Sequence, residues 1–248
     1  TKLRYPRKDG ESDLNYQRRL SRVTDQYVAD MLEHRINPIL DVDPLSPFEL
    51  DRVEDYRKLG LNNFAVGKKG GSFHNNWLSD NEDIESLVPL YRSYGEKLKN
   101  AELLQYQYVY AWDEGKIGNP IVQRVTAMIH QAYPGLKNMV CYPGFWDPAK
   151  DPEWGKDIDI CCFWIESFSE SQANTLRQRG MELWMYVGGP LNPGFPNLAI
   201  DYVPMNHRII PWLCWKYDLK GFLYWGVNWW PYVDPFESAM NTKWQQNG

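Results

Sequence analysis

Hydrophobic residues in this chain follow two spacings, one typical of helices and the other typical of buried strands. In residues 12–36 they recur every three or four positions, which places Val23, Tyr27 and Met31 on one face of an amphipathic helix. Pro38 ends that helix, because proline has no backbone N–H to donate. Residues 38–41 follow as a short apolar run, and such a run predicts a strand that is buried on both faces.

The same alternation of helix and strand continues along the rest of the chain. Residues that favour helix starts and ends separate the segments, such as Pro120 in a first helical turn and Gly60 and Gly180 after helix ends. We expect further helices at residues 47–60, 82–100, 120–133, 171–179 and 205–217, and further strands at residues 63–67, 106–112, 137–142, 159–165, 182–187 and 221–227.

Strands that alternate with helices predict an α/β fold in which crossover helices join parallel strands. We expect a (β/α)8 TIM-type barrel in a single domain over residues 1–248. The barrel is expected to be incomplete, because seven strands are readable and neither a first strand nor a last helix is found. The simplest interpretation is that the chain is part of a longer one. An open doubly wound sheet is the alternative, although no Gly-x-Gly-x-x-Gly loop indicates a dinucleotide site.

Charge and composition narrow the classes of partner. The net charge of −5 disfavours nucleic acid as a partner, and no apolar run reaches about 18 residues, so we expect no membrane span. The polar segment after Thr1 does not resemble a signal peptide, although secretion stays open, and nothing defines the oligomeric state. Neither the histidines nor the four cysteines have the spacing of metal ligands. We therefore expect no metal and no cofactor, with all four cysteines buried as small apolar side chains.

Aromatic residues are numerous, with 12 Trp and 16 Tyr among 248 residues. Such rings pack well in cores, and they also stack on the apolar face of a sugar while polar groups meet its hydroxyls. Sugar binding is favoured where rings gather at the ends of strands. In a parallel barrel the active site lies at the carboxyl ends of the strands, so the residues at those ends are the candidates for chemistry.

These strand ends carry carboxylates, an amide and several rings, a combination that suits a polyhydroxylated substrate. The candidate catalytic residues are Asp113 and Glu114, which directly follow an apolar run. Several candidates also have a structural interpretation. The rings can instead pack in the core, Arg208 can instead form an ion pair with Asp201, and Asn228 can instead form a turn. The candidate substrate-binding residues are Trp112, Tyr142, Trp164, Glu166, Tyr186, Arg208, Trp225 and Asn228.

Asp113 and Glu114 are consecutive, and this decides which mechanism they suit. Two adjacent carboxylates that are partly removed from water oppose each other's ionisation, which favours one of them as a proton donor. A solvated loop pair is the competing interpretation. Most glycosidases place two carboxylates on either side of the scissile bond. Neighbouring acids instead suit a sugar whose own 2-acetamido oxygen attacks the anomeric carbon, because the leaving oxygen and the acetamido N–H then lie close together.

Two segments also carry a family resemblance. One is Tyr110-Ala-Trp-Asp-Glu114, and the other is a C-terminal stretch that includes Leu183-Trp-Met-Tyr-Val187, His207-Arg208 and Gly221-Phe-Leu-Tyr-Trp-Gly-Val-Asn-Trp229. In these segments the chain resembles glycoside hydrolase family 123, the β-N-acetylgalactosaminidases. The acidic pair is similar to the family's Asp-Glu pair at a strand end, and the C-terminal stretch is similar to its catalytic region. The similarity extends from about Leu20 onward.

The resemblance implies a barrel that hydrolyses terminal β-linked N-acetylgalactosamine of a glycolipid or glycoprotein, with retention through an oxazolinium-type intermediate. It assigns Asp113 to the acetamido group and Glu114 to acid/base catalysis. Family members usually carry an N-terminal β-sandwich, which this sequence does not show, and their pair is often followed by proline where this chain has Gly115. A β-N-acetylhexosaminidase of broader specificity and a glycan-binding protein without catalysis are the alternatives.

Overall fold

A computed structural model describes residues 7–67, 83–114, 116–142, 155–188 and 202–226, together with residues 144, 147, 150, 153, 192 and 194–199. In these residues, helices alternate with short strands. The α-helices are α1 (Asp13–Glu33), α2 (Pro47–Lys58), α3 (Val88–Asn100), α4 (Pro120–Ala132), α5 (Glu170–Gln178) and α6 (Pro204–Lys216). The strands are β1 (Asp41–Val42), β2 (Phe64–Val66), β3 (Gln107–Trp112), β4 (Asn138–Tyr142), β5 (Ile160–Trp164), β6 (Glu182–Val187) and β7 (Gly221–Tyr224).

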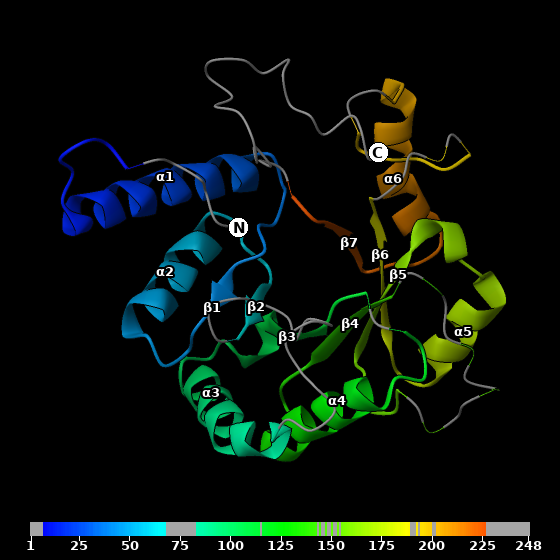
Figure 1. Cartoon of the computed structure of the whole chain (residues 1–248). Helices are drawn as coiled ribbons and strands as arrows, with labels where there is room; N and C mark the ends of the chain where they lie inside the picture. Colours follow the sequence, from blue (N-terminus) through cyan, green and yellow to red (C-terminus); the bar gives the residue numbers. More distant parts are fainter. Residues whose placement is uncertain are drawn as a thin grey trace.

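The strands form one parallel sheet in which spatial order follows sequence order from β1 to β7. Figure 1 shows the sheet curled into an arc, with α2, α3, α4 and α5 around its convex side. An open doubly wound sheet would reverse its strand order and carry helices on both faces. The chain therefore has the predicted α/β barrel fold of TIM type, and the described strands form an incomplete barrel.

The expected elements are all present, with shifts of a few residues at their ends. The largest change affects the helix expected at residues 82–100, where the 3-10 helix η1 (Ile84–Leu87) precedes α3. Pro89 occupies the first turn of α3, where its missing N–H costs no helical hydrogen bond. The first strand is shorter than expected and begins at Asp41, because Pro38 cannot donate to a neighbouring strand.

Buried residues form two layers on the two faces of the sheet. The outer layer lies between strands and helices and includes Val109, Val140 and Met185. The inner layer lies on the concave face and consists of Ala65, Tyr108, Met139, Cys141, Ile160, Cys162, Trp184, Tyr186 and Leu223. Strand residues alternate between the layers as the pleat requires, so the layer to which a residue belongs shows where its side chain points.

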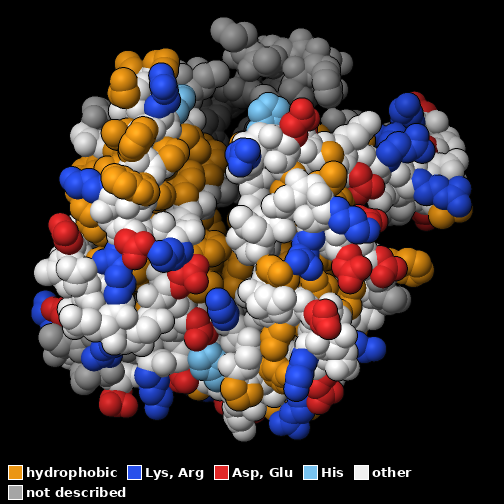
Figure 2. Space-filling view, turned by 180° about the vertical axis from the view of Figure 1, so that it is seen from behind, with side chains coloured by type: hydrophobic (Ala, Val, Ile, Leu, Met, Phe, Trp, Pro, Cys, Tyr) orange, Lys and Arg blue, Asp and Glu red, His pale blue; other side chains and the backbone are white. Residues whose placement is uncertain are grey.

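Helix α6 differs from the others because it buries little of its surface. Ile210 is its fully buried residue, while Met205, Ile209, Trp212 and Trp215 form an exposed stripe at spacings of three and four residues. Figure 2 shows these hydrophobic side chains gathered over α6. The same shallow packing leaves Cys214 half-buried. The expectation that all cysteines are buried is therefore confirmed for Cys141, Cys161 and Cys162 and wrong for Cys214.

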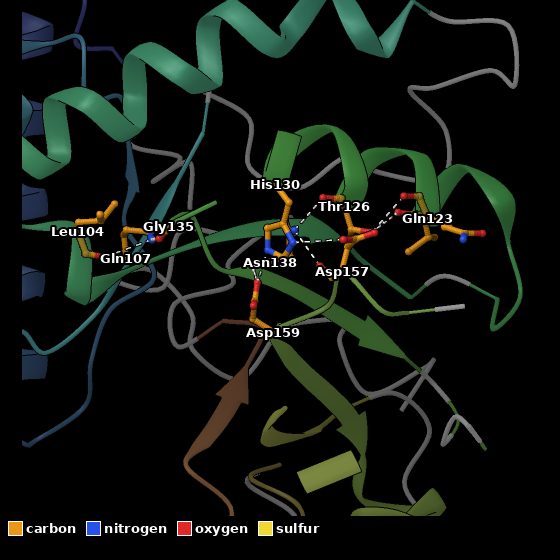
Figure 3. Close-up of polar contacts among 10 residues, drawn as sticks. Leu104, Gln107, Gln123, Thr126, His130, Gly135, Asn138, Asp157 and Asp159 are labelled. Atoms are coloured by element: carbon orange, nitrogen blue, oxygen red, sulfur yellow. Dashed lines mark hydrogen bonds and ion pairs between the residues drawn. The ribbon is translucent and has the colours of Figure 1, made fainter. Parts of the chain in front are cut away.

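The amino ends of the strands, which we call the base of the barrel, are tied together by a polar network (Figure 3). His130 of α4 contacts Asp159 through Nε2 at 2.9 Å and Asp157 through Nδ1 at 3.4 Å. Asp159 also accepts a hydrogen bond from the backbone N–H of Asn138 at 2.6 Å. The Asn138 amide donates in turn to the carbonyl oxygens of Thr126 and Asp157. This network joins α4 to the starts of β4 and β5.

Candidate active site

The carboxyl end of β3 departs from regular alternation, and this departure brings Asp113 to the concave face. The pairing of β3 with β4 shifts register between Tyr110 and Trp112, which is the mark of a β-bulge. Ala111 and Trp112 consequently both belong to the outer layer, although they are consecutive. Tyr110 packs against the inner layer, and its hydroxyl donates to Oδ1 of Asp113 at 2.7 Å. Asp113 therefore lies on the inner side, which strict alternation would have given to Trp112.

Glu114 reaches the same side through its backbone conformation. Its φ of 47° lies in the left-handed region, which residues other than glycine rarely adopt. The turn brings Oε1 of Glu114 to 3.3 Å from the hydroxyl of Tyr186, a residue of β6 in the inner layer. A strained residue that is held in place by distant contacts is typical of functional sites. The bulge and this turn together bring two consecutive carboxylates to one face.

Two cysteines lie beneath the acids and between the two tyrosines. Cys141 of β4 and Cys162 of β5 are partners in register, and both belong to the inner layer. Burial raises the pKa of Cys162, and the Cys141 thiol and the Asp113 carboxylate raise it further. A buried thiol of this kind stays protonated and acts as a small apolar side chain. The acids therefore stand over an uncharged surface.

Both tyrosines are held in the protonated form that donates hydrogen bonds. Burial raises the pKa of Tyr110 well above its usual value, and the Cys141 thiol and the Asp113 carboxylate add to the effect. Burial likewise raises the pKa of Tyr186, with further contributions from Cys141 and Glu114. Each carboxylate thus accepts a hydrogen bond from a neutral hydroxyl that stays protonated at physiological pH.

Aromatic rings stand beside the acids on β5, β6 and β7. The rings of Trp164 and Tyr186 lie 5.6 Å apart between centroids. Trp225 follows β7 and is 37% exposed, and a Cβ on Gly188, which follows β6, would lie 3.4 Å from its ring. Glu166 follows β5, is exposed, and accepts a hydrogen bond from Asn192 at 2.9 Å. We call this end of the strands the mouth of the barrel.

Two of the other candidate residues point away from the mouth. Trp112 and Tyr142 are 1% and 0% exposed in the outer layer, where they face the helices. Arg208 is exposed on α6, in the outer ring of helices. Asn228 lies outside the described residues, as does Asp201, the expected partner of Arg208. The mouth therefore combines Asp113, Glu114, Trp164, Glu166, Tyr186 and Trp225, and the sequence analysis missed Tyr110, Cys141 and Cys162 as their neighbours.

The surface also has a hollow away from the mouth. A hollow of about 500 Å³ on α1 is lined by Glu11, Asn15, Arg18, Arg19, Arg22 and Val23. Among the described residues, no group of three or more His, Cys, Asp or Glu side chains is placed to hold a metal ion. In the same part of the chain, no helix is both long and apolar enough to cross a membrane.

The sequence of this chain matches the model of one known protein family. The sequence model of the glycoside hydrolase 123 catalytic domain matches residues 73–248, which include every candidate residue of the mouth. The chain belongs to glycoside hydrolase family 123. The acids at the mouth of this family 123 barrel stand where parallel barrels place their active sites. No sequence in a search of curated proteins matches it.

Solved structures resemble the family 123 chain at low sequence identity. A family 123 glycoside hydrolase from Clostridium perfringens, studied for glycolipid glycan hydrolysis, is 14% identical with a TM-score of 0.41, over 59% of this chain and 26% of that one. A β-D-glucuronidase from Dictyoglomus thermophilum is 13% identical with a TM-score of 0.48, over 83% and 40%. A GH10 xylanase from Thermobacillus composti is 14% identical with a TM-score of 0.40, over 74% and 72%. The matched region thus spans less than half the length of the first two proteins.

Proposed function

We propose that this chain removes terminal β-linked N-acetylgalactosamine from a glycolipid or glycoprotein, with the sugar's own 2-acetamido group as the nucleophile. The observation that supports this most is the convergence of consecutive acids at one face, Asp113 through the bulge and Glu114 through its left-handed turn. Two carboxylates that flank a bond from opposite sides come from separate strands in most glycosidases. Consecutive carboxylates suit two target atoms that lie close together on one sugar.

In the proposed reaction, the acetamido oxygen attacks the anomeric carbon while the glycosidic C–O bond breaks. Glu114 donates its proton to the departing oxygen, and Asp113 accepts a hydrogen bond from the acetamido N–H and stabilises the positive charge of the oxazolinium ring. Glu114 then takes a proton from water as that water attacks the anomeric carbon and opens the ring. Two inversions give net retention.

The surroundings of the two acids support this division of roles. Glu114 is exposed and is reached by the Tyr186 hydroxyl, so it can meet both a leaving group and water. Asp113 is half-buried beside Tyr110 and the uncharged thiols, where an acetamido group with its apolar methyl finds a matched environment. Trp164 and Trp225 offer ring faces for the sugar.

Two chromogenic substrates test the proposal in the full-length chain. Aryl β-N-acetylgalactosaminide should turn over, whereas the matching β-galactoside, which has a 2-hydroxyl and no acetamido oxygen, should not. Proton NMR of the first product should show the β-anomer. Equal rates on both sugars, or an α-anomer as first product, would contradict the participation of the acetamido group.

The same assay separates the galacto from the gluco preference. Aryl β-N-acetylglucosaminide differs only in the orientation of the 4-hydroxyl, so its relative kcat/KM measures contacts to that group. Comparable values for the two sugars would make the chain a broader β-N-acetylhexosaminidase. Binding of N-acetylgalactosamine without turnover of any substrate would favour a glycan-binding role instead.

A further inference from the structure

Tyr110 makes a close polar contact with one of the two acids. Its hydroxyl lies 2.7 Å from Oδ1 of Asp113, compared with 3.3 Å between Tyr186 and Glu114. The ring of Tyr110 is anchored in the inner layer, one strand away from Cys141. Packing of the ring therefore sets the position of the Tyr110 hydroxyl, and its hydrogen bond restricts rotation of the Asp113 side chain.

We propose that Tyr110 is a positioning residue, whose hydroxyl holds the Asp113 carboxylate on the inner face of the barrel where the acetamido N–H has to be met. This inference rests on the proposed function and deepens it. The β-bulge makes the contact, because Ala111 and Trp112 both point to the outer layer and positions 110 and 113 therefore become neighbours on the inner face. Without the bulge, Asp113 would point toward the helices.

The contact also distinguishes the surroundings of the two neighbouring acids. Desolvation raises the pKa of Tyr110, so its hydroxyl stays protonated and can only donate to Asp113. The bond holds Oδ1 of Asp113 on the half-buried side of the site, where the same carboxyl group can accept from an acetamido N–H. Glu114 is exposed, so this acid can reach both a leaving group and water. Tyr110 thereby separates the roles of neighbouring residues.

The test compares Tyr110→Phe with Tyr108→Phe in the full-length chain. Tyr108 lies two residues earlier on β3, in the same inner layer, and is 2% exposed, so its substitution removes a buried hydroxyl without touching the acids. Tyr110→Phe should lower kcat on aryl β-N-acetylgalactosaminide by about 10- to 100-fold with KM within about twofold, because a displaced catalytic group costs rate more than binding. Tyr108→Phe should change neither kcat nor KM.

The outcomes separate this inference from the proposed function. A wild-type chain that is active, with Tyr110→Phe retaining its kcat, overturns the positioning role and leaves the function intact. A wild-type chain that turns over no 2-acetamido substrate overturns the function. In that case crystal structures still decide the positioning role, since Asp113 should leave the inner face in Tyr110→Phe. An unmoved Asp113 carboxylate overturns the inference whatever the activity.

Discussion

The two ends of the barrel both hold a pair of carboxylates, yet they treat them in opposite ways. At the base, Asp157 and Asp159 surround His130, which can carry a positive charge, and Asp159 also accepts a backbone N–H. At the mouth, the acids accept hydrogen bonds from neutral tyrosine hydroxyls above buried thiols. The base pairs its charge with a cation in a network that joins elements. The mouth holds its charge in place and keeps it available.

This difference explains why similar residues serve stability at one end and chemistry at the other. A carboxylate that is paired with a cation gains stability in the folded state and resists proton transfer. A carboxylate that is held by a neutral donor keeps its reactivity, and the chain accepts backbone strain at Glu114 to place it. Each prediction below tests whether the two ends are as distinct as this comparison requires.

The largest effect is expected from Glu114→Gln at the mouth. The variant keeps the size of the side chain but has no proton to give, so kcat should fall by about 100- to 10,000-fold with little change in stability. Steady-state kinetics on an aryl β-N-acetylgalactosaminide measures the loss. Glu102→Gln is a matched control, since Glu102 is also exposed with a left-handed φ of 56° and should retain full activity. Full activity in Glu114→Gln would remove this residue from the proposed chemistry.

The next effect is expected at the base from Asp159→Ala. The change leaves His130 and the Asn138 N–H without the carboxylate that both contact, so the free energy of unfolding should fall by about 2 kcal/mol while kcat on a small substrate stays unchanged. Urea denaturation measures the first quantity. Asp55→Ala, which removes an exposed contact to Lys58, should cost far less. A large loss of kcat in correctly folded Asp159→Ala would mean that the ends are coupled.

Replacement of Glu114 by glycine should stabilise the chain while it abolishes activity. Glycine adopts a left-handed φ without steric cost, and after its own entropy loss a net gain of about 0.5 to 1 kcal/mol is expected. Glu102→Gly provides the comparison at a position with no proposed catalytic role, and it should gain a similar amount with kcat unchanged. If Glu114→Gly lowers the urea midpoint, the strain at the mouth is smaller than the contacts that Glu114 makes there.

The base should also show its charge as a pH dependence of stability. The hydrogen bond to Asp159 raises the pKa of His130, and the charges of Asp159 and Asp157 support the same direction against desolvation. A raised folded-state pKa means that this stabilisation is complete below the unfolded value of about 6.5 and is lost as pH rises through the folded-state value. The Tm difference between wild type and His130→Gln should therefore shrink as pH increases from about 6.5. A difference that grows with pH would contradict the ion pairing.

Much of this architecture follows from the sequence, because hydrophobic spacing defines the strands and helices directly. All seven strands were expected, and the acidic pair was found because an apolar run ends at Asp113. Tyr142 was expected to contact substrate, but regular alternation along β4 puts it on the opposite face from Cys141. Trp112 was expected to do the same, but the bulge in β3, which depends on pairing with β4, turns it to the outer layer. The base network was missed for a similar reason. Asp157 and Asp159 are distant in sequence from both His130 and Asn138, and only the folded sheet brings them together.

The smallest effect tests whether charge at the base matters only when it is tied into the network. Lys137 precedes β4 and lies 3.9 Å from Glu182, with 46% and 32% of their side chains exposed. Solvent screens such a pair, and Glu182 already accepts a hydrogen bond from Trp184 at 2.7 Å, so Lys137→Ala should change the free energy of unfolding by at most about 0.5 kcal/mol. Glu182→Ala should cost more, because it also leaves the Trp184 indole N–H without this acceptor. Equal losses in the two variants would show that the Lys137 charge itself stabilises the base, and the contrast with His130 would then lie in burial alone.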